Sequence, residues 1–145
     1  MRINTRDFGE MEISKEGLVE FVAPILGFEQ CRQFVLLYDD ELGEMFTWLQ
    51  STEDSDVCFI LVDPAMIDPA YAPALPKDAC KMLGFGKNAK PLFLSITVIT
   101  DNFADATVNL KSPIVINADN NTAMQVVLED EYPVRALLLP ENAEA

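Results

Sequence analysis

Histidine is absent from this 145-residue chain, which removes the side chain that most often serves as a general base at neutral pH. No Gly-x-Ser-x-Gly elbow or Ser–Lys pair takes its place, so the sequence gives no support to nucleophilic catalysis. Catalysis by carboxylates alone is the one enzymatic mechanism that this composition leaves open. We predict that the protein is not an enzyme.

Cysteines are few and widely spaced. Cys31, Cys58 and Cys80 are odd in number, form no Cys-x-x-Cys pair and have no histidine to complete a zinc site. Neither a structural metal nor a disulfide framework follows from this pattern. Cys58 lies in an apolar segment, where we expect it to pack as a small hydrophobic side chain. The sequence predicts no cofactor.

Long apolar runs are also missing. No run reaches the roughly 18 residues that a membrane-spanning helix needs, and the first residues show no signal-peptide core. We therefore expect a cytoplasmic protein without a membrane partner. The length favours one domain over residues 1–140, and the polar residues 141–145 are expected to form a disordered tail.

Positive charge is scarce. The chain has 24 acidic against 10 basic residues, a net charge of −14. Such a surface is repelled by the phosphate backbone of nucleic acids, so a charged partner should be cationic. Solubility alone is the alternative explanation for the acidic residues. One short stretch, 77–90, is an exception, because it carries four lysines and one aspartate. This stretch is either a second contact surface or a solvated helix face.

Short apolar runs bounded by Gly, Pro, Asn or Asp recur along the chain, which is typical of an antiparallel β protein. We predict a mainly β fold, a small antiparallel β-barrel-like or two-layer β domain with one short helix. The strand at 92–100 alternates along its whole length and should lie in the middle of the sheet. The expected strands are 2–5, 10–13, 18–22, 33–38, 45–50, 57–62, 92–100, 106–110, 114–117, 123–128 and 133–138.

The expected helix covers 75–83. Pro76 suits its first turn, and Gly84 suits its end. The following Gly84–Lys87 segment lacks the spacing and the Ser or Thr of a phosphate-binding loop, so nucleotide binding is not expected.

Acidic clusters at 53–56 and 129–131 resemble metal-binding loops only in composition. The first lacks the glycine and the distal glutamate of a calcium loop and lies between two expected strands. We interpret both clusters as solvated turns.

Two segments are candidates for partner contact. Trp48 and Gln50 lie on one expected strand, where Trp48 is either a core residue or an interface anchor. The run at 107–117 joins two short strands through a polar, proline-containing kink and ends in an amide. Its Asn residues either cap turns or contact a partner. The candidate partner-binding residues are Trp48, Gln50, Asn109, Lys111, Ser112 and Asn117.

A series of motifs runs through the chain in a fixed order. They are an opening hairpin at 3–13, a Phe-then-Gly-Phe-Glu stretch at 19–29, Phe-Thr-Trp-Leu-Gln-Ser at 46–51, Val-Asp-Pro at 62–64, Tyr71, Thr-Val-Asn-Leu-Lys-Ser-Pro-Ile-Val-Ile-Asn at 107–117, and the stretches 125–128 and 132–135. In this order and spacing they resemble the FliW family of flagellar assembly factors. Ala23 departs from the family pattern, in the loop before Pro24.

The resemblance implies a cytoplasmic regulatory protein with two protein partners. One is flagellin, and the other is CsrA, an RNA-binding regulator that represses flagellin translation. Flagellin would hold the factor until its secretion frees the factor to bind CsrA. The resemblance implies no direct contact with nucleic acid. The alternative is a generic acidic β domain that binds a peptide or carbohydrate, or an accessory subunit of a larger enzyme.

Overall fold

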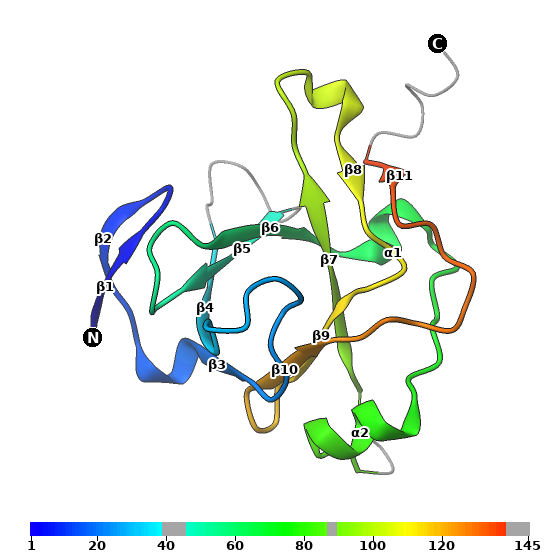
Figure 1. Cartoon of the computed structure of the whole chain (residues 1–145), viewed down its shortest axis with the longest axis horizontal. Coiled ribbons are helices and arrows are strands. Elements are labelled where there is room, and N and C mark those ends of the chain that lie inside the picture. The colour runs from blue at the N-terminus through cyan, green and yellow to red at the C-terminus, as the bar shows by residue number, and fades with distance from the viewer. Residues whose placement is uncertain (39–45, 87–89, 139–145) are drawn as a thin grey trace.

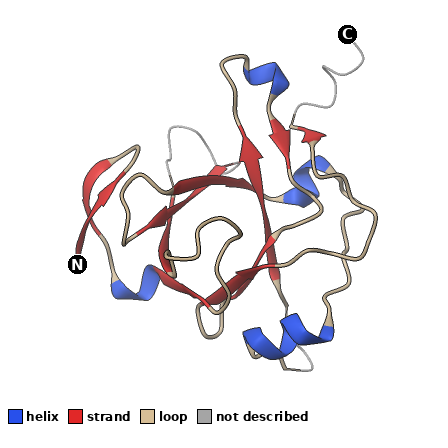
Figure 2. Cartoon of the chain, in the orientation of Figure 1, coloured by secondary structure: helices blue, strands red, loops and turns tan. Residues whose placement is uncertain are grey.

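A computed structural model describes residues 1–38, 46–86 and 90–138 of the chain (Figures 1 and 2). Most of its regular structure is short strands, because apolar segments of a few residues alternate with polar turns. The strands are β1 (Arg2–Thr5), β2 (Gly9–Glu12), β3 (Leu18–Phe21), β4 (Gln33–Leu37), β5 (Phe46–Ser51), β6 (Cys58–Val62), β7 (Leu92–Val98), β8 (Thr107–Val108), β9 (Ile114–Asn117), β10 (Thr122–Gln125) and β11 (Ala136–Leu137). The helical segments are η1 (Lys15–Gly17), α1 (Pro64–Ile67), α2 (Lys77–Leu83) and η3 (Phe103–Asp105).

A closed barrel of seven strands forms the centre of the molecule, visible as a ring in Figure 2. Its order is β7, β6, β5, β4, β3, β10 and β9, and β9 pairs back to β7. Closure removes the free edges that an open sheet would present. The prediction of a small, mainly β, barrel-like fold is confirmed. Among the described strands, β3 and β10 form the only parallel pair, and all other pairs are antiparallel.

Large apolar side chains point into the barrel interior. Phe21, Phe34, Leu49, Leu61 and Ile114 have no exposed surface. They come from neighbouring strands, because alternate residues of a strand point to the same side. The ring centroids of Phe21 and Phe34 lie 5.0 Å apart, within the range of favourable aromatic pairs. Among the described residues, the interior of the barrel is therefore a hydrophobic core.

Two structures cover the outside of the barrel. The β1–β2 hairpin packs Ile3 and, just beyond β2, Ile13 against Trp48, and Phe8 meets Trp48 edge-on at 5.2 Å between ring centroids. Helix α2 packs Leu83 against Val115 of β9. Figure 1 shows the hairpin at the left of the barrel and α2 below it.

Strand β7 has the central position that its alternation predicted, because it pairs with β6, β8 and β9. It pairs with β6 only through Ser95 and Ile96. Beyond these residues β7 pairs with β8, and β11 adds to β8 outside the ring. Thr97 is the first residue of β7 that pairs with β8, and its hydroxyl donates to the Ile60 carbonyl of β6 at 2.8 Å.

Several predicted boundaries need correction. The strands expected at 106–110, 123–128 and 133–138 are shorter, because beyond the assigned strands their chains meet through isolated hydrogen bonds. The Leu110 amide donates to the Pro133 carbonyl, and the Leu128 amide to the Lys111 carbonyl. The helical turn α1 was not predicted, although Asp63 caps it and Pro64 begins it.

The expected helix at 75–83 begins at Lys77, with Pro76 as its N-cap, and ends before Gly84 as predicted. Met45, at the start of one expected strand, Lys87 and the 141–145 tail lie outside the described residues. Within the described ranges, no helix is long and apolar enough to cross a bilayer.

Candidate interaction surface

Trp48 lies in the core beneath the hairpin. Its exposed fraction is 5%, and it packs among Ile3, Ile13 and Leu37. The core interpretation of this residue therefore holds in the free protein. A direct contact between Trp48 and a partner would require the hairpin to move.

Gln50 has no exposed surface, and its amide joins the hairpin to the barrel. The side-chain carbonyl accepts a hydrogen bond from the Arg6 amide at 2.9 Å. The side-chain NH₂ donates to the Ser55 carbonyl at 3.1 Å and also to the carbonyls of Ser51 and Val57. Buried polar groups are normally satisfied in this way. Gln50 therefore holds the hairpin in position against the β5–β6 turn.

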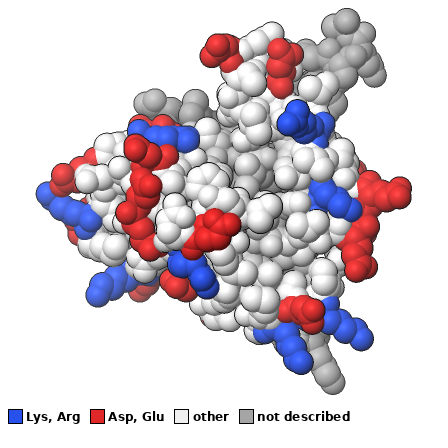
Figure 3. All heavy atoms as spheres, viewed as in Figure 1, with Lys and Arg blue, Asp and Glu red and all other residues white. Residues whose placement is uncertain are grey.

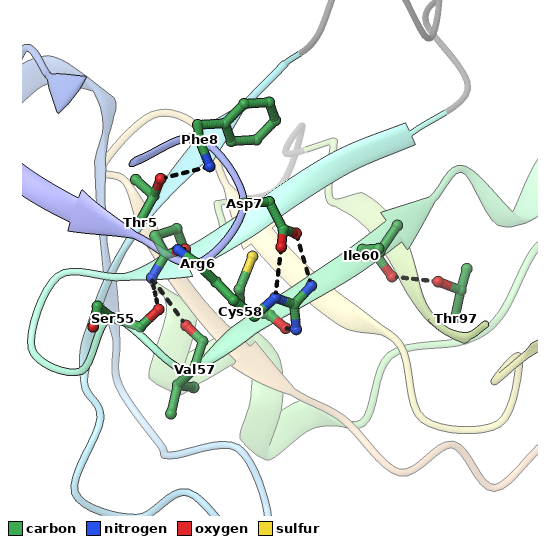
Figure 4. Close-up of polar contacts among 10 residues, drawn as sticks. Thr5, Arg6, Asp7, Phe8, Ser55, Val57, Cys58, Ile60 and Thr97 are labelled. Atoms are coloured by element: carbon green, nitrogen blue, oxygen red, sulfur yellow. Dashed lines mark hydrogen bonds and ion pairs between the residues drawn. The ribbon is translucent and has the colours of Figure 1, made fainter. Parts of the chain in front are cut away.

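Arg6 anchors the same corner of the molecule (Figure 4). Its guanidinium donates to the Cys58 carbonyl at 2.8 Å and forms two hydrogen bonds to the Asp7 carboxylate, at 3.1 and 2.9 Å. The bond to Asp7 raises the pKa of Arg6, and the bond from Arg6 lowers the pKa of Asp7. Burial raises the pKa of the Cys58 thiol to about 11, so the thiol is neutral at physiological pH. As predicted, Cys58 packs as a buried, free cysteine.

The kink at 109–112 satisfies its own backbone. The Asn109 side-chain oxygen accepts from the amides of Lys111 at 3.1 Å and Ser112 at 3.0 Å. The Lys111 ammonium donates to the Asp130 carbonyl at 2.6 Å, and the Tyr71 hydroxyl donates to the Leu110 carbonyl at 2.8 Å. The Asn109 side chain thus caps a turn, which was one of the two alternatives.

Asn117 is also a turn residue, with an exposed fraction of 4%. Its side-chain NH₂ donates to the Leu83 carbonyl at 2.7 Å, and its oxygen accepts from the Asp119 amide at 3.0 Å. Asn120 and Thr122 donate to the same carbonyl at 3.1 and 3.4 Å. The last carbonyls of a helix have no partner within the helix, so these side chains hold the end of α2 against the β9–β10 turn.

The most exposed apolar side chains on this part of the surface were not among the candidates. Leu26 is 82% exposed and Val127 is 66% exposed. Gln125 connects Leu26 to the kink, because its side-chain oxygen accepts from the Leu26 amide at 3.3 Å and its NH₂ donates to the Ser112 carbonyl at 3.4 Å. Val127 follows Gln125 by two residues in the chain. We call Leu26, Ser112, Gln125 and Val127 the Leu26 patch.

Contiguous exposed apolar patches rimmed by polar groups mark contact sites for other proteins, and we take the Leu26 patch as a candidate for such a site. The sequence alone does not single out Leu26, because the neighbouring Ile25 in the same loop is a similar aliphatic residue and is only 2% exposed. The loop that carries Leu26 lies across the barrel mouth in Figure 1.

The acidic segment 53–56 is a turn between β5 and β6, as predicted. The Glu53 carboxylate accepts from the amides of Arg32 at 2.8 Å and Gln33 at 2.7 Å, and the Asp54 carboxylate accepts from the Asp56 amide. In the part of the chain that the structure describes, no group of three His, Cys, Asp or Glu side chains is placed to hold a metal ion. Figure 3 shows acidic and basic side chains interspersed among uncharged ones over this face of the molecule.

Comparison with known proteins identifies the family of this chain. The family model described as FliW protein matches residues 2–138. The chain belongs to the FliW family. Its relatives include the flagellar assembly factor FliW of Caldanaerobacter subterraneus subsp. tengcongensis, which is 33% identical over 100% of this chain and 97% of the relative. The flagellar assembly factor FliW of Syntrophus aciditrophicus is 38% identical over 93% of this chain and 85% of the relative.

The fold agrees with a solved member of the family. A crystal structure of the flagellar assembly factor FliW superposes with a TM-score of 0.88 at 32% sequence identity, and it covers 97% of this chain and 98% of that chain. The suspected family is therefore confirmed, and the barrel is the fold of a FliW protein. The family is one of assembly factors and not of enzymes, in agreement with the sequence.

Proposed function

We propose that the protein is a cytoplasmic regulator of flagellin synthesis that binds flagellin and a CsrA-type RNA-binding repressor. Family membership over residues 2–138 carries the proposal. The net charge of −14 supports it, because an RNA-binding repressor presents a basic surface that an acidic protein attracts. Binding to CsrA releases flagellin messenger for translation, and binding to flagellin withdraws the factor from CsrA.

The Leu26 patch is the contact face that we assign to one of these partners. Ser112 belongs to the patch, and Lys111 is its neighbour in the chain. The buried candidates Trp48, Gln50 and Asn117 and the half-buried Asn109 support the contact by holding the hairpin and the turns in place. A few well-packed, desolvated side chains near the centre of an interface contribute most of its binding energy, and we propose Leu26 as one of them.

A reconstitution with purified components tests the partner switch. Labelled flagellin messenger is first bound to CsrA, and the protein is then added. We expect release of the messenger, and we expect flagellin to reverse this release. An unrelated domain of similar size and net charge is the control for non-specific electrostatic competition. Failure to bind CsrA and flagellin in separate pull-downs would contradict the proposal.

Substitution of the patch tests the assigned face. Leu26→Asp should weaken binding of one partner by about tenfold or more, because it places a charge where an apolar contact forms. Met66→Asp is the matched control, since Met66 on α1 is 57% exposed and the charge change is the same. Equal affinities of the two variants would remove the Leu26 patch from the interface.

A further inference from the structure

The surface beside α2 is hollowed. Two adjoining hollows of about 240 and 450 Å³ share Cys80 and Phe85 in their walls. The smaller is lined by Leu75 and Pro91 as well, and the larger by Lys77 and Lys81. We call the two hollows together the α2 groove. Its floor is largely apolar, and its rim along the helix is basic.

The charge of this rim is opposite to that of the molecule. Lys77 and Lys81 are four residues apart, so they project from the same side of the helix, and both are exposed. Within the described residues neither lysine forms an ion pair or a side-chain hydrogen bond. Among the described residues that line the groove, Asp78 is the only acidic one. In a chain of net charge −14, two unpaired lysines beside an apolar hollow form a local site for negative charge.

We propose that the α2 groove binds an acidic peptide segment of a partner protein, with a bulky apolar side chain of the peptide in the hollow and its carboxylates beside Lys77 and Lys81. The apolar lining favours a peptide over a nucleic acid, because a nucleic acid needs extended positive charge along its backbone and this molecule is acidic elsewhere. The basic rim of the groove is opposite in sign to the net charge of −14 that we propose attracts CsrA, and the groove shares no residue with the Leu26 patch. It is therefore a second contact site, and it stands independently of the proposed function.

Cys80 gives a direct measure of occupancy. It lies in the wall of both hollows and is half-buried, whereas Cys31 is 1% exposed and Cys58 is 8% exposed. A thiol reagent should therefore label Cys80 first in the folded protein, and a bound peptide should protect it. The probe is a synthetic peptide with Phe and Leu between pairs of Glu, and the control peptide has Lys in place of each Glu. Cys80→Ser identifies the signal of this thiol.

We expect the acidic peptide to slow the labelling of Cys80 in a saturable manner and the lysine peptide to leave the rate unchanged. The double variant Lys77→Glu/Lys81→Glu should bind the acidic peptide with an affinity about fivefold lower than that of the parent protein. The change is modest because each exposed ion pair contributes little binding energy. Lys15→Glu is the matched control, because Lys15 is exposed on η1, outside the groove.

Three outcomes would overturn the proposal. They are equal protection by both peptides, protection that persists unchanged in the double variant, and no protection at any peptide concentration. Light scattering on the protein alone separates a further case. Self-association that the double variant abolishes would show that a second copy of this acidic chain occupies the groove, and it would contradict the assignment to a different partner. None of these results depends on CsrA or flagellin, so the proposed function can fail or hold separately.

Discussion

Buried amides connect the elements of this small barrel. Gln50 ties the hairpin to the β5–β6 turn, and Asn117 ties the β9–β10 turn to the end of α2. Each satisfies backbone groups that have no partner in a strand or helix, and leaving such groups unpaired in a core costs free energy. These residues were selected as candidates for partner contact because amides at strand ends have the same appearance in a sequence whether they face inward or outward.

Replacement of Asn117 should therefore affect stability first. Asn117→Ala removes the acceptor of the Asp119 amide and one donor to the Leu83 carbonyl, so we expect the free energy of unfolding to fall by about 1–2 kcal/mol. Urea unfolding measures this change, and titration with CsrA measures affinity on the same variant. Asn4→Ala is the control, because Asn4 is exposed and makes no side-chain hydrogen bond within the described residues. Lost affinity with an unchanged unfolding midpoint would restore Asn117 as a contact residue.

The buried thiol of Cys58 predicts a loss of stability in alkali. Its pKa is about 11 in the folded protein against 9.0 for an ordinary thiol, so the folded state holds its proton at pH values where the unfolded state has lost it. The free energy of unfolding should then decrease as the pH rises from about 9 to 11. Burial also raises the pKa of Tyr71, which acts in the same direction above its ordinary value of 10.0.

Cys58→Val isolates the thiol. Urea unfolding at about pH 8 and about pH 10.5 should show a smaller decrease in this variant than in the parent protein, and Tyr71→Phe should reduce the remainder. Cys80→Ser serves as the control for a half-buried cysteine. A decrease of the same size in Cys58→Val would show that the thiol does not contribute to the alkaline transition.

At the scale of elements, the end of α2 depends on a glycine. Gly84 has φ of 72°, in the left-handed region, and an added Cβ would lie 3.2 Å from the Asn120 side-chain nitrogen. Gly84→Ala should lower the free energy of unfolding by about 1–2 kcal/mol, because other residues are strained in this region. The neighbouring Gly86→Ala is the control, since an added Cβ there meets nothing within 4 Å. Similar unfolding midpoints for the two variants would refute a structural requirement at Gly84.

Elements with a strong local pattern were predictable. The strand 114–117 and the glycine end of α2 agree with the structure, because a short apolar run bounded by turn residues and a glycine specify them locally. The sequence does not predict the limits of the two-residue strands β8 and β11 or the turn α1. Their limits depend on where distant segments meet, as at the Leu110–Pro133 hydrogen bond. The Leu26 patch was missed for a similar reason, since Gln125 lies 99 residues away in the chain from Leu26.

On the scale of the whole molecule, a closed barrel supports surfaces of different character. Closure makes the centre a packed core, so binding must use the outside: the loop over the barrel mouth, the hairpin and α2. The net charge of this molecule is −14, whereas the rim of the α2 groove carries Lys77 and Lys81. A molecule built in this way distinguishes partners by charge and by the side of the barrel that they approach.

The charge of −14 predicts how binding to CsrA depends on salt. Screening acts over about 8 Å at physiological ionic strength and about 3 Å at 1 M, so added salt should weaken the long-range attraction while short apolar contacts persist. We expect the association rate to fall by about tenfold or more between low and high salt, with a smaller change in the dissociation rate. Surface plasmon resonance measures both rates. Leu26→Asp provides the contrast: if the patch contacts CsrA, this variant should raise the dissociation rate at every salt concentration. An association rate indifferent to salt would show that the acidic surface serves solubility and does not guide CsrA to its site.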